Sequence, residues 1–301
     1  MRKPLASIVL VTRNGAATLP ALLDAIDRQR VDFAFDVVAV DSSSVDGTAE
    51  LLRERAATFL SIRPESFDHG ATRNLAIAHS HGDLIVLIVQ DAVPASEGWL
   101  EALTAPLRAD PTLAGVFARQ IPRPDASALA RWHLERWAGA SLVPRTVALT
   151  AAEFDAMSPR ERLERCTFDN VCSCIRRSVW LAHPFRATPM AEDLEWARDV
   201  LLAGYRLAYA PAAAVIHSHD RSIRYEFMRT RLLHRRLREL FGLRAVPTAI
   251  ALARAVATTV VAHLQRERSL RAAALGVVWP LGQYLGGRSV GRVSTPAARA
   301  A

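Results

Sequence analysis

The sequence predicts an α/β protein with a doubly wound, mostly parallel sheet. Short, continuous runs of β-branched residues, such as residues 84–89, are typical of strands buried on both faces of such a sheet. These runs alternate with helical patterns, as in folds with a parallel sheet. Two of the runs end at a carboxylate, Asp41 or Asp91, and open α/β sheets bind their ligands at the carboxyl ends of the strands.

The chain up to residue 91 alternates strands with helices. Leu19, Leu22, Leu23 and Ile26 recur with helical spacing and predict a helix that buries one face. The polar segment 42–48 has the composition of a turn that joins a strand to a helix. We expect strands at residues 7–12, 36–40, 59–62 and 84–89, and helices at residues 18–30, from residue 49, and around residues 72–79.

Prolines in residues 120–125 interrupt this alternation. Helical residues follow around Trp132 and Trp137, and Gly204 is placed to end a later helix. Beyond Arg221 the composition becomes arginine-rich and then rich in alanine and valine. We expect one domain at residues 1–220 and a helical C-terminal extension at residues 221–301. The expected elements are a charged loop at 158–165, a strand at 167–175, a loop at 183–190, a helix at 193–202, a last core strand at 213–217, and helices ending at 241, 264 and 285.

Composition narrows the function classes. The chain has 301 residues, 50% of them hydrophobic, and can fold around a sizeable core. A net charge of +8 favours anionic partners: nucleotides, phospholipid surfaces or nucleic acid. The basic residues after Arg221 lack interleaved stacking aromatics, so we expect no nucleic-acid partner. Residues 1–4 lead straight into a strand-like segment, so we expect no signal peptide, and three cysteines without paired zinc spacing (Cys166, Cys172 and Cys174) fit a reducing cytoplasm.

The two strand-end carboxylates each have alternative interpretations. Asp91 could contact a ligand, or it could form a turn or cap a helix. Asp41 could accept a hydrogen bond from a base or ribose, or cap the following helix. The first turn, residues 12–17, lacks the G-x-G-x-x-G pattern, which disfavours a dehydrogenase.

Three further motifs carry possible chemistry. Backbone amides in residues 67–74 and the guanidinium of Arg73, expected in a first helical turn, could hold a diphosphate, although such an arginine could also lie at the surface. The acids of residues 192–195 could complement a helix dipole or supply a general base. His217 and His219 alternate after a strand and could ligate a metal or serve a structural role.

Together these motifs resemble the family 2 glycosyltransferases of the GT-A fold over residues 5–235, and most closely the bacterial rhamnosyltransferase branch. The resemblance rests on five segments: Phe67-x-His69-Gly70-x-Thr72-Arg73-Asn74, Gln90-Asp91-Ala92, Ile175-Arg176-Arg177-Ser178-Val179-Trp180, Glu192-Asp193-Leu194-Glu195-Trp196 and His217-Ser218-His219.

The resemblance implies a role for each site residue. Asp193 would be the catalytic base, and Asp91 and His217 would bind Mg²⁺ or Mn²⁺, with His219 a less favoured ligand. The usual metal motif has two acids, whereas here only Asp91 is acidic, which leaves fewer charged ligands. The donor-binding residues would be Thr12, Asp41, Arg73 and Gln90, and the acceptor-side candidates are Glu192 and Trp196.

The resemblance therefore implies an inverting glycosyltransferase. It would move L-rhamnose from dTDP-L-rhamnose, a nucleotide-sugar donor, to a hydroxyl of a bacterial surface-glycan or lipid-linked acceptor. Two alternatives stay open. A nucleotidyltransferase would need a glycine- and Arg/Lys-rich loop after the first strand, which residues 12–17 lack. A non-catalytic nucleotide-sugar-binding or membrane-scaffold protein would keep the fold without the base.

The C-terminal extension predicts contact with a membrane surface. Residues 221–244 carry eight arginines among apolar residues, a basic amphipathic pattern. Residues 246–264 are long enough to cross a bilayer, but Arg254 lies in the middle of the segment. We expect an interfacial or protein-packed helix, and a cytoplasmic enzyme that is peripheral on the inner face of the cell membrane.

Overall fold

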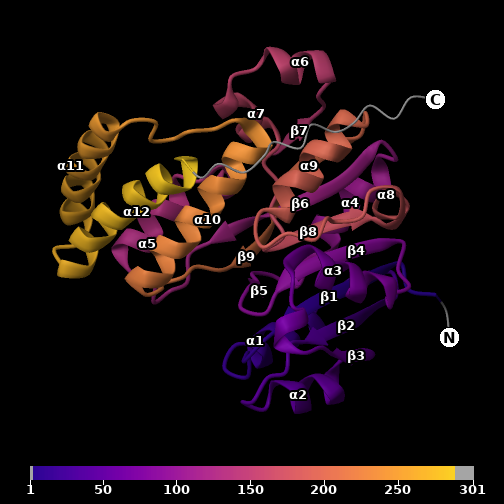
Figure 1. Ribbon diagram of the computed structural model, residues 1–301. Helices are drawn as coiled ribbons and strands as arrows, with labels where there is room; N and C mark the ends of the chain where they lie inside the picture. Colours follow the sequence, from indigo (N-terminus) through magenta and orange to yellow (C-terminus); the bar gives the residue numbers. More distant parts are fainter. Residues whose placement is uncertain (1–2, 289–301) are drawn as a thin grey trace. The chain divides into compact units, whose positions relative to one another are not determined.

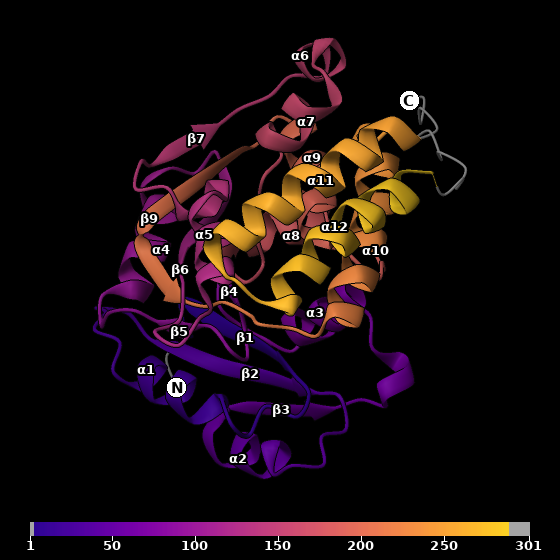
Figure 2. The same ribbon diagram turned by 90° about the vertical axis from the view of Figure 1, so that its left-hand side faces the viewer.

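The computed structural model describes residues 3–288. The chain divides into two compact units. The first consists of residues up to Met157 together with Glu164–Asp220, and the second of Ser158–Leu163 together with residues from Arg221 onward. In Figures 1 and 2 the first unit contains the sheet and its flanking helices, and the second contains the three long C-terminal helices.

Within the described residues, nine strands of the first unit form one mixed sheet in the order β3-β2-β1-β4-β8-β6-β9-β5, with β7 paired to β9. β1, β2, β3 and β4 are parallel, β8 is antiparallel to both β4 and β6, and β6 is parallel to β9. The predicted α/β fold with a mostly parallel sheet is confirmed. The strands are β1 Ala6–Thr12, β2 Phe35–Asp41, β3 Thr58–Ser61, β4 Leu84–Val89, β5 Val93–Pro94, β6 Leu113–Ile121, β7 Arg145–Val147, β8 Cys172–Arg176 and β9 Arg206–Ile216.

Helices cover the sheet and build the core. Apolar residues of α1 and α4, including the fully buried Leu22, Ile26 and Trp99, pack with sheet residues such as Ile8 and Val86. The helices of this unit are α1 Leu19–Asp27, α2 Thr48–Arg55, α3 His69–Ala78, α4 Trp99–Ala109, α5 Ala128–Glu135, α6 Ala151–Ala156, α8 Arg177–Ala182 and α9 Glu192–Leu202, with 3-10 turns at Pro64–Ser66 and Ala138–Ala140. Helix α7, Pro159–Arg165, begins in the residues assigned to the second unit.

The structure corrects three predicted elements and adds others, among them α4 and β6. The charged segment 158–165 is a helix instead of a loop, because Ser158 and Glu161 form a reciprocal capping box: the Glu161 carboxylate accepts from the Ser158 amide at 2.8 Å. The predictions lacked α4 and β6 altogether. The expected strand at 167–175 is shorter, Cys172–Arg176, and the last core strand is longer, beginning at Arg206.

The second unit consists mainly of α10 Ile223–Phe241, α11 Ala249–Arg266 and α12 Leu270–Arg288. Helix α12 lies between α10 and α11 (Figure 2) and packs against both. A Cβ atom on Gly276 would lie 2.7 Å from Val260 Cα, so a glycine is needed where α12 meets α11. Among residues 3–288, no helix combines the length and the apolar character that crossing a membrane requires.

Candidate active site

The predicted functional side chains gather at one edge of the sheet. β1, β2, β4, β6 and β9 all run in the same direction, so their carboxyl ends meet at this edge, whereas β8 runs in the opposite direction and begins there. This topology places residues from distant parts of the sequence together. At or next to this edge lie Thr12, Asp41, Gln90, Asp91, Gln120, Asp169, Asn170, His217 and His219.

Thr12 and Asp41 lie side by side, paired in register at the ends of β1 and β2. The Thr12 hydroxyl donates to Asp41 Oδ1 at 3.0 Å, and the Ser44 hydroxyl and amide donate to the same carboxylate at 2.5 and 2.8 Å. Asp41 thus fixes the turn after β2, and the alternative that it caps the next helix is wrong. Helix α2 begins after Gly47 without a side-chain cap, and the Thr48 amide donates to Asp46 Oδ1 at 3.2 Å.

Gln90 holds the loop that follows β1. Its Oε1 accepts from the Arg13 amide at 2.8 Å, and its Nε2 donates to the Arg13 carbonyl at 3.0 Å. A Cβ atom on Gly15 would lie 2.8 Å from Gln90 Oε1, so a glycine leaves room for this clamp. Since both polar atoms of the amide bond to the backbone of Arg13, Gln90 fixes the loop after β1, and its direct contact with a donor remains a prediction.

The helix that contains Arg73 begins earlier than predicted. Helix α3 begins at His69, so Arg73 lies in its second turn. The Asp68 carboxylate caps the helix and accepts from the amides of Gly70 and Ala71 at 2.9 and 2.8 Å. Because those amides are already bonded to an acid, they do not form the expected diphosphate cradle.

Arg73 is buried and forms an ion pair with Glu192, with 2.8 Å between Nη1 and Oε1. The side chains are 9% and 6% exposed, so the alternative of a surface arginine is wrong. Asn170 Nδ2 also donates to Glu192 Oε1 at 3.4 Å. The pair therefore joins α3 to the start of α9, and Glu192 does more than complement a helix dipole.

Asp193 stands at the start of α9, half-buried beside Asn170. Its Oδ2 accepts from the Asn170 amide at 3.3 Å, and its Oδ1 accepts from the Leu194 amide at 2.8 Å. Burial, followed by the neighbouring charges of Glu192 and Asp169, raises the pKa of the Asp193 carboxyl well above its ordinary value. A carboxylate whose pKa is raised is a stronger base than an ordinary aspartate, which suits it to general-base catalysis.

Trp196, predicted on the acceptor side, is 2% exposed. Its ring packs between Phe168 and Phe185, and its Nε1 donates to the His183 carbonyl at 2.9 Å. In this position Trp196 supports α9 from within the core. Its contact with an acceptor remains a prediction.

Backbone strain marks the loops around this edge. In the described part of the chain, the non-glycine residues with positive φ are Asn14, Ser43 and Ala191, at φ of 49°, 51° and 61°. Asn14 follows β1, Ser43 follows β2, and Ala191 precedes α9. Such conformations cost about 1–3 kcal/mol each and cluster at functional sites.

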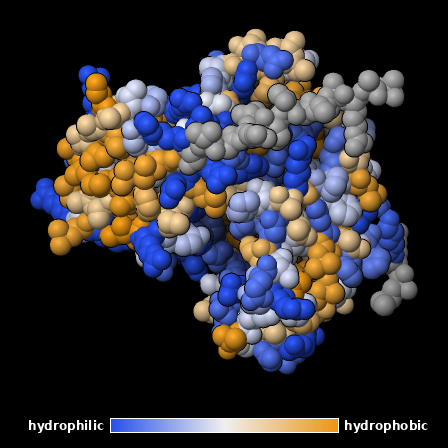
Figure 3. Space-filling view, viewed as in Figure 1, coloured by the Kyte–Doolittle hydropathy of each residue, from blue (hydrophilic) through white to orange (hydrophobic). Residues whose placement is uncertain are grey.

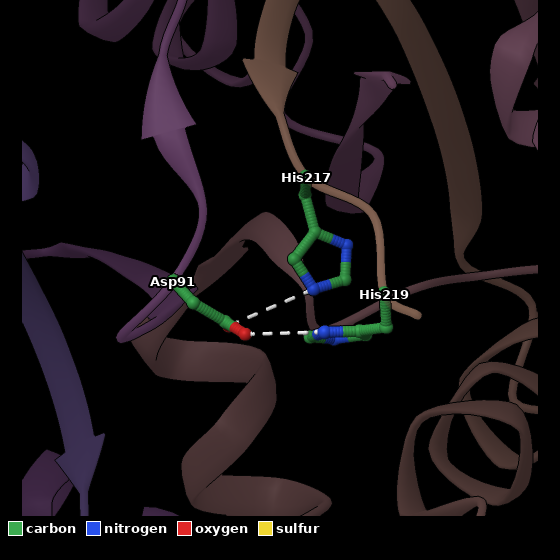
Figure 4. Close-up of side chains that lie close together, drawn as sticks. All are labelled: Asp91, His217 and His219. Atoms are coloured by element: carbon green, nitrogen blue, oxygen red, sulfur yellow. Dashed lines mark ion pairs between the residues drawn. The ribbon is translucent and has the colours of Figure 1, made fainter. Parts of the chain in front are cut away.

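Asp91, His217 and His219 form a group that can hold a metal ion (Figure 4). Asp91 Oδ1 lies 3.6 Å from His217 Nε2, and Asp91 Oδ2 lies 3.4 Å from His219 Nδ1. Ligands about 2.1 Å from an octahedral ion are about 3 Å apart when adjacent and about 4.2 Å apart when opposite. The observed separations fall within that range. His219, ranked below His217 from the sequence, belongs to the group, and two imidazoles favour Mn²⁺ over Mg²⁺.

The sequence prediction missed two contributors to this edge. Gln120 in β6 bonds to His217 Nδ1 at 2.7 Å and to Asp169 Oδ2 at 2.6 Å. Asn170 bonds to both Asp193 and Glu192. These contacts connect the metal-binding group to the start of α9. A polar Gln120 at the end of an apolar run was the available signal, but β6 was not predicted.

Comparison with known proteins identifies relatives. Glycosyl transferase family 2 matches residues 7–177. The chain is 31% identical over 227 residues to an O-antigen chain rhamnosyltransferase, RfbN, of Salmonella typhimurium, covering 74% of this chain and 69% of the relative. It is 32% identical over 197 residues to the O-antigen chain rhamnosyltransferase WbaN of Salmonella anatum, covering 64% and 59%.

Solved structures share the fold. A mannosyltransferase, PcManGT, from Pyrobaculum calidifontis in complex with GDP-Man and Mn²⁺ superposes with a TM-score of 0.60 at 19% identity, covering 96% of this chain and 89% of that one. Glucosyl-3-phosphoglycerate synthase from Mycobacterium tuberculosis, in complex with Mn²⁺ and UDP-glucose, superposes with a TM-score of 0.55 at 18% identity. The match covers 82% of this chain and 81% of that one. At these identities the likeness concerns the fold.

Proposed function

Because this chain belongs to glycosyl transferase family 2 and has the GT-A fold, we propose that it is an inverting glycosyltransferase that moves L-rhamnose from dTDP-L-rhamnose to a hydroxyl of a surface-glycan or lipid-linked acceptor. The observation that carries the proposal is the meeting of a metal-binding group and a carboxyl with a raised pKa at one edge of the sheet. The names of the two Salmonella relatives support the choice of sugar.

The donor side has two parts in this proposal. Thr12 and Asp41 lie where a nucleotide can be bound, and the buried Asp41 carboxylate can accept from a base or ribose. Asp91, His217 and His219 would hold Mn²⁺ or Mg²⁺. When bound, the ion supplies a Lewis acid that offsets the negative charge on the departing nucleoside diphosphate.

Asp193 is the base in this proposal. It removes the proton from the acceptor hydroxyl as that oxygen attacks the anomeric carbon, and the bond from this carbon to the diphosphate breaks. The amides of Asn170 and Leu194 orient the carboxylate. A single displacement of this kind inverts the anomeric configuration and needs no enzyme nucleophile.

The second unit carries a candidate membrane-binding surface, which we call the α11 stripe and define as Ile250, Ala253, Ala257, Val261 and Leu264. These residues recur every three or four positions along α11 and are exposed, Ile250 at 69% and Val261 at 56%. Figure 3 shows hydrophobic side chains gathered over α11. Arginines near the α11 stripe (Arg254, Arg266 and Arg268) suit an anionic lipid surface, so we propose that the enzyme binds the inner face of the cell membrane peripherally.

The proposal is tested by thermal shift and by turnover. We expect dTDP-L-rhamnose with Mn²⁺ to raise the Tm more than other nucleotide sugars do, because the ligand that binds most tightly stabilises the folded state most. A ligand at 100 times its Kd adds about 2.7 kcal/mol to the free energy of unfolding. With a lipid-linked acceptor, sugar transfer should stop in excess EDTA and return with Mn²⁺. Full activity in EDTA would contradict the metal assignment. Donor binding without turnover would favour a non-catalytic nucleotide-sugar-binding protein.

A further inference from the structure

Gln120 stands between the candidate metal-binding group and a half-buried acid, Asp169. It lies near the carboxyl end of β6 and is 7% exposed. Its two amide atoms bond in opposite directions, to Asp169 Oδ2 at 2.6 Å and to His217 Nδ1 at 2.7 Å. The same imidazole presents Nε2 to Asp91 at 3.6 Å.

The chemistry of these groups fixes the direction of both hydrogen bonds of Gln120. An ionised carboxylate can only accept, so the Gln120 atom that faces Asp169 is the Nε2 donor. The other atom, Oε1, can only accept, so His217 Nδ1 carries the proton that it receives. A neutral imidazole with its proton on Nδ1 has its lone pair on Nε2, which is the atom that faces Asp91.

We infer that Gln120, oriented by Asp169, is a positioning residue that holds His217 in the Nδ1–H tautomer, in which the Nε2 lone pair can ligate a metal. The inference rests on the metal site of the proposed function and adds the means by which that site is kept ready. A ligating histidine whose second nitrogen is bonded to a fixed acceptor has its ring orientation and basicity set by that partner.

The same short segment also reaches the candidate base. Asp169 receives the Gln120 bond and a bond from the Val171 amide at 2.8 Å, while the next residue, Asn170, donates to Asp193 at 3.3 Å. Residues 169–170 therefore position both the metal-binding histidine and the base. The segment that precedes β8 thus contacts both parts of the proposed site.

The test begins with the metal-free full-length protein. Long-range ¹H–¹⁵N NMR distinguishes the two tautomers of a neutral imidazole, and the His217 signals are assigned by their loss in His217→Gln. We expect Nδ1–H in the wild type. Gln120→Met removes the acceptor and should release the preference. Asp169→Asn is nearly isosteric, but its amide NH₂ group would face Gln120 as a donor. The Gln120 amide should then rotate by half a turn, so that its Nε2 donates to His217 Nδ1. His217 should consequently change to the Nε2–H tautomer.

The second readout is Mn²⁺ affinity, measured by titration with electron paramagnetic resonance of the free ion. Gln120→Met and Asp169→Asn should each raise the Kd for Mn²⁺ by about 10–100-fold, as is typical for loss of an outer-shell partner. The matched control is Gln29→Met. The Gln29 amide also bonds in two directions, but to the backbones of residues 25, 96 and 100, and this change should leave both readouts as in the wild type.

Two outcomes would overturn the inference: Nε2–H in wild-type His217, or a tautomer and a Kd for Mn²⁺ that neither variant changes. Failure of the wild type to bind Mn²⁺ would instead remove the metal from the proposed function. The tautomers of the metal-free proteins would still decide whether Gln120 and Asp169 set the state of His217.

Discussion

The guanidinium of Arg73 and the carboxylate of Glu192 form a buried ion pair, with 2.8 Å between Nη1 and Oε1. Arg73 belongs to α3, assigned to the donor by resemblance, and Glu192 begins α9, assigned to the acceptor side. One pair of charges therefore links α3 to the start of α9 within the candidate site. Each charge depends on the other, because an unpaired ion in the protein interior is strongly unfavourable.

Glu192→Gln should consequently destabilise the protein. It keeps the shape of the side chain but removes the charge that compensates Arg73, and breaking a buried pair costs about 3–5 kcal/mol. Urea unfolding would measure the loss. The control is Glu50→Gln, which breaks an exposed pair with Arg53 and should cost less than about 1 kcal/mol. Equal small losses in both variants would show that the Arg73–Glu192 pair contributes nothing beyond a surface contact.

Asp41→Ala should weaken donor binding. The loss of a hydrogen bond to a charged group is worth about 1.5–3 kcal/mol, or roughly 10–150-fold in Kd. Calorimetric titration with the nucleotide sugar measures it. Because Asp41 also holds Ser44, the control is Ser44→Ala, which removes a hydroxyl bond to Asp41 but leaves the carboxylate. If Ser44→Ala weakens donor binding as much as Asp41→Ala, the effect lies in the loop and not in a contact with the nucleotide.

The α11 stripe should drive binding to anionic lipid. Burial of each Ile or Val side chain is worth about 1.5–3 kcal/mol, so the double variant Ile250→Glu, Val261→Glu should lower partitioning onto phosphatidylglycerol-containing vesicles more than about tenfold. Co-sedimentation measures the bound fraction. Leu142→Glu alters a residue of the first unit that is 71% exposed and should have little effect. Vesicle binding that survives the double variant would exclude the α11 stripe as the contact.

Asp193 should make stability depend on pH. Folding raises the pKa of this carboxyl, so the folded protein retains the proton at pH values where the unfolded chain has lost it. The resulting stabilisation is fully present below the ordinary pKa of about 4 and is lost as the pH rises toward the raised value. Asp193→Asn cannot ionise.

The Tm of Asp193→Asn minus that of the wild type should therefore increase from about pH 4 upward and level off above the raised pKa. Thermal unfolding across this pH range, without donor or metal, provides the measurement. A difference that stays constant with pH would mean that folding does not perturb this carboxyl.

Strands β2 and β4 could be predicted because each is a short apolar run that ends at, or is followed by, polar residues. Asp41 and Asp91 were located this way, and the sheet direction places both at one edge. Gln120 could not be located, because β6 leads into a proline-rich stretch that was interpreted as a break in the fold.

Pairs of side chains from distant parts of the sequence could not be predicted for a different reason. The Arg73–Glu192 pair joins residues 119 positions apart (192 − 73), and no local pattern specifies it. The opposing influences on Asp193, a helix start that lowers its pKa and burial beside two acids that raises it, could be identified from the sequence only in part. Their balance required the packing around α9.

The proposed role of Asp193 as the catalytic base is tested by single-turnover sugar transfer by Asp193→Asn at saturating donor and metal. Loss of a general base should lower the rate by about 10²–10⁴-fold, with donor Kd unchanged. Glu192→Gln, compared at a temperature where it remains folded, should retain far more activity. Transfer by Asp193→Asn at the wild-type rate, or an inactive Glu192→Gln beside an active Asp193→Asn, would contradict the assignment.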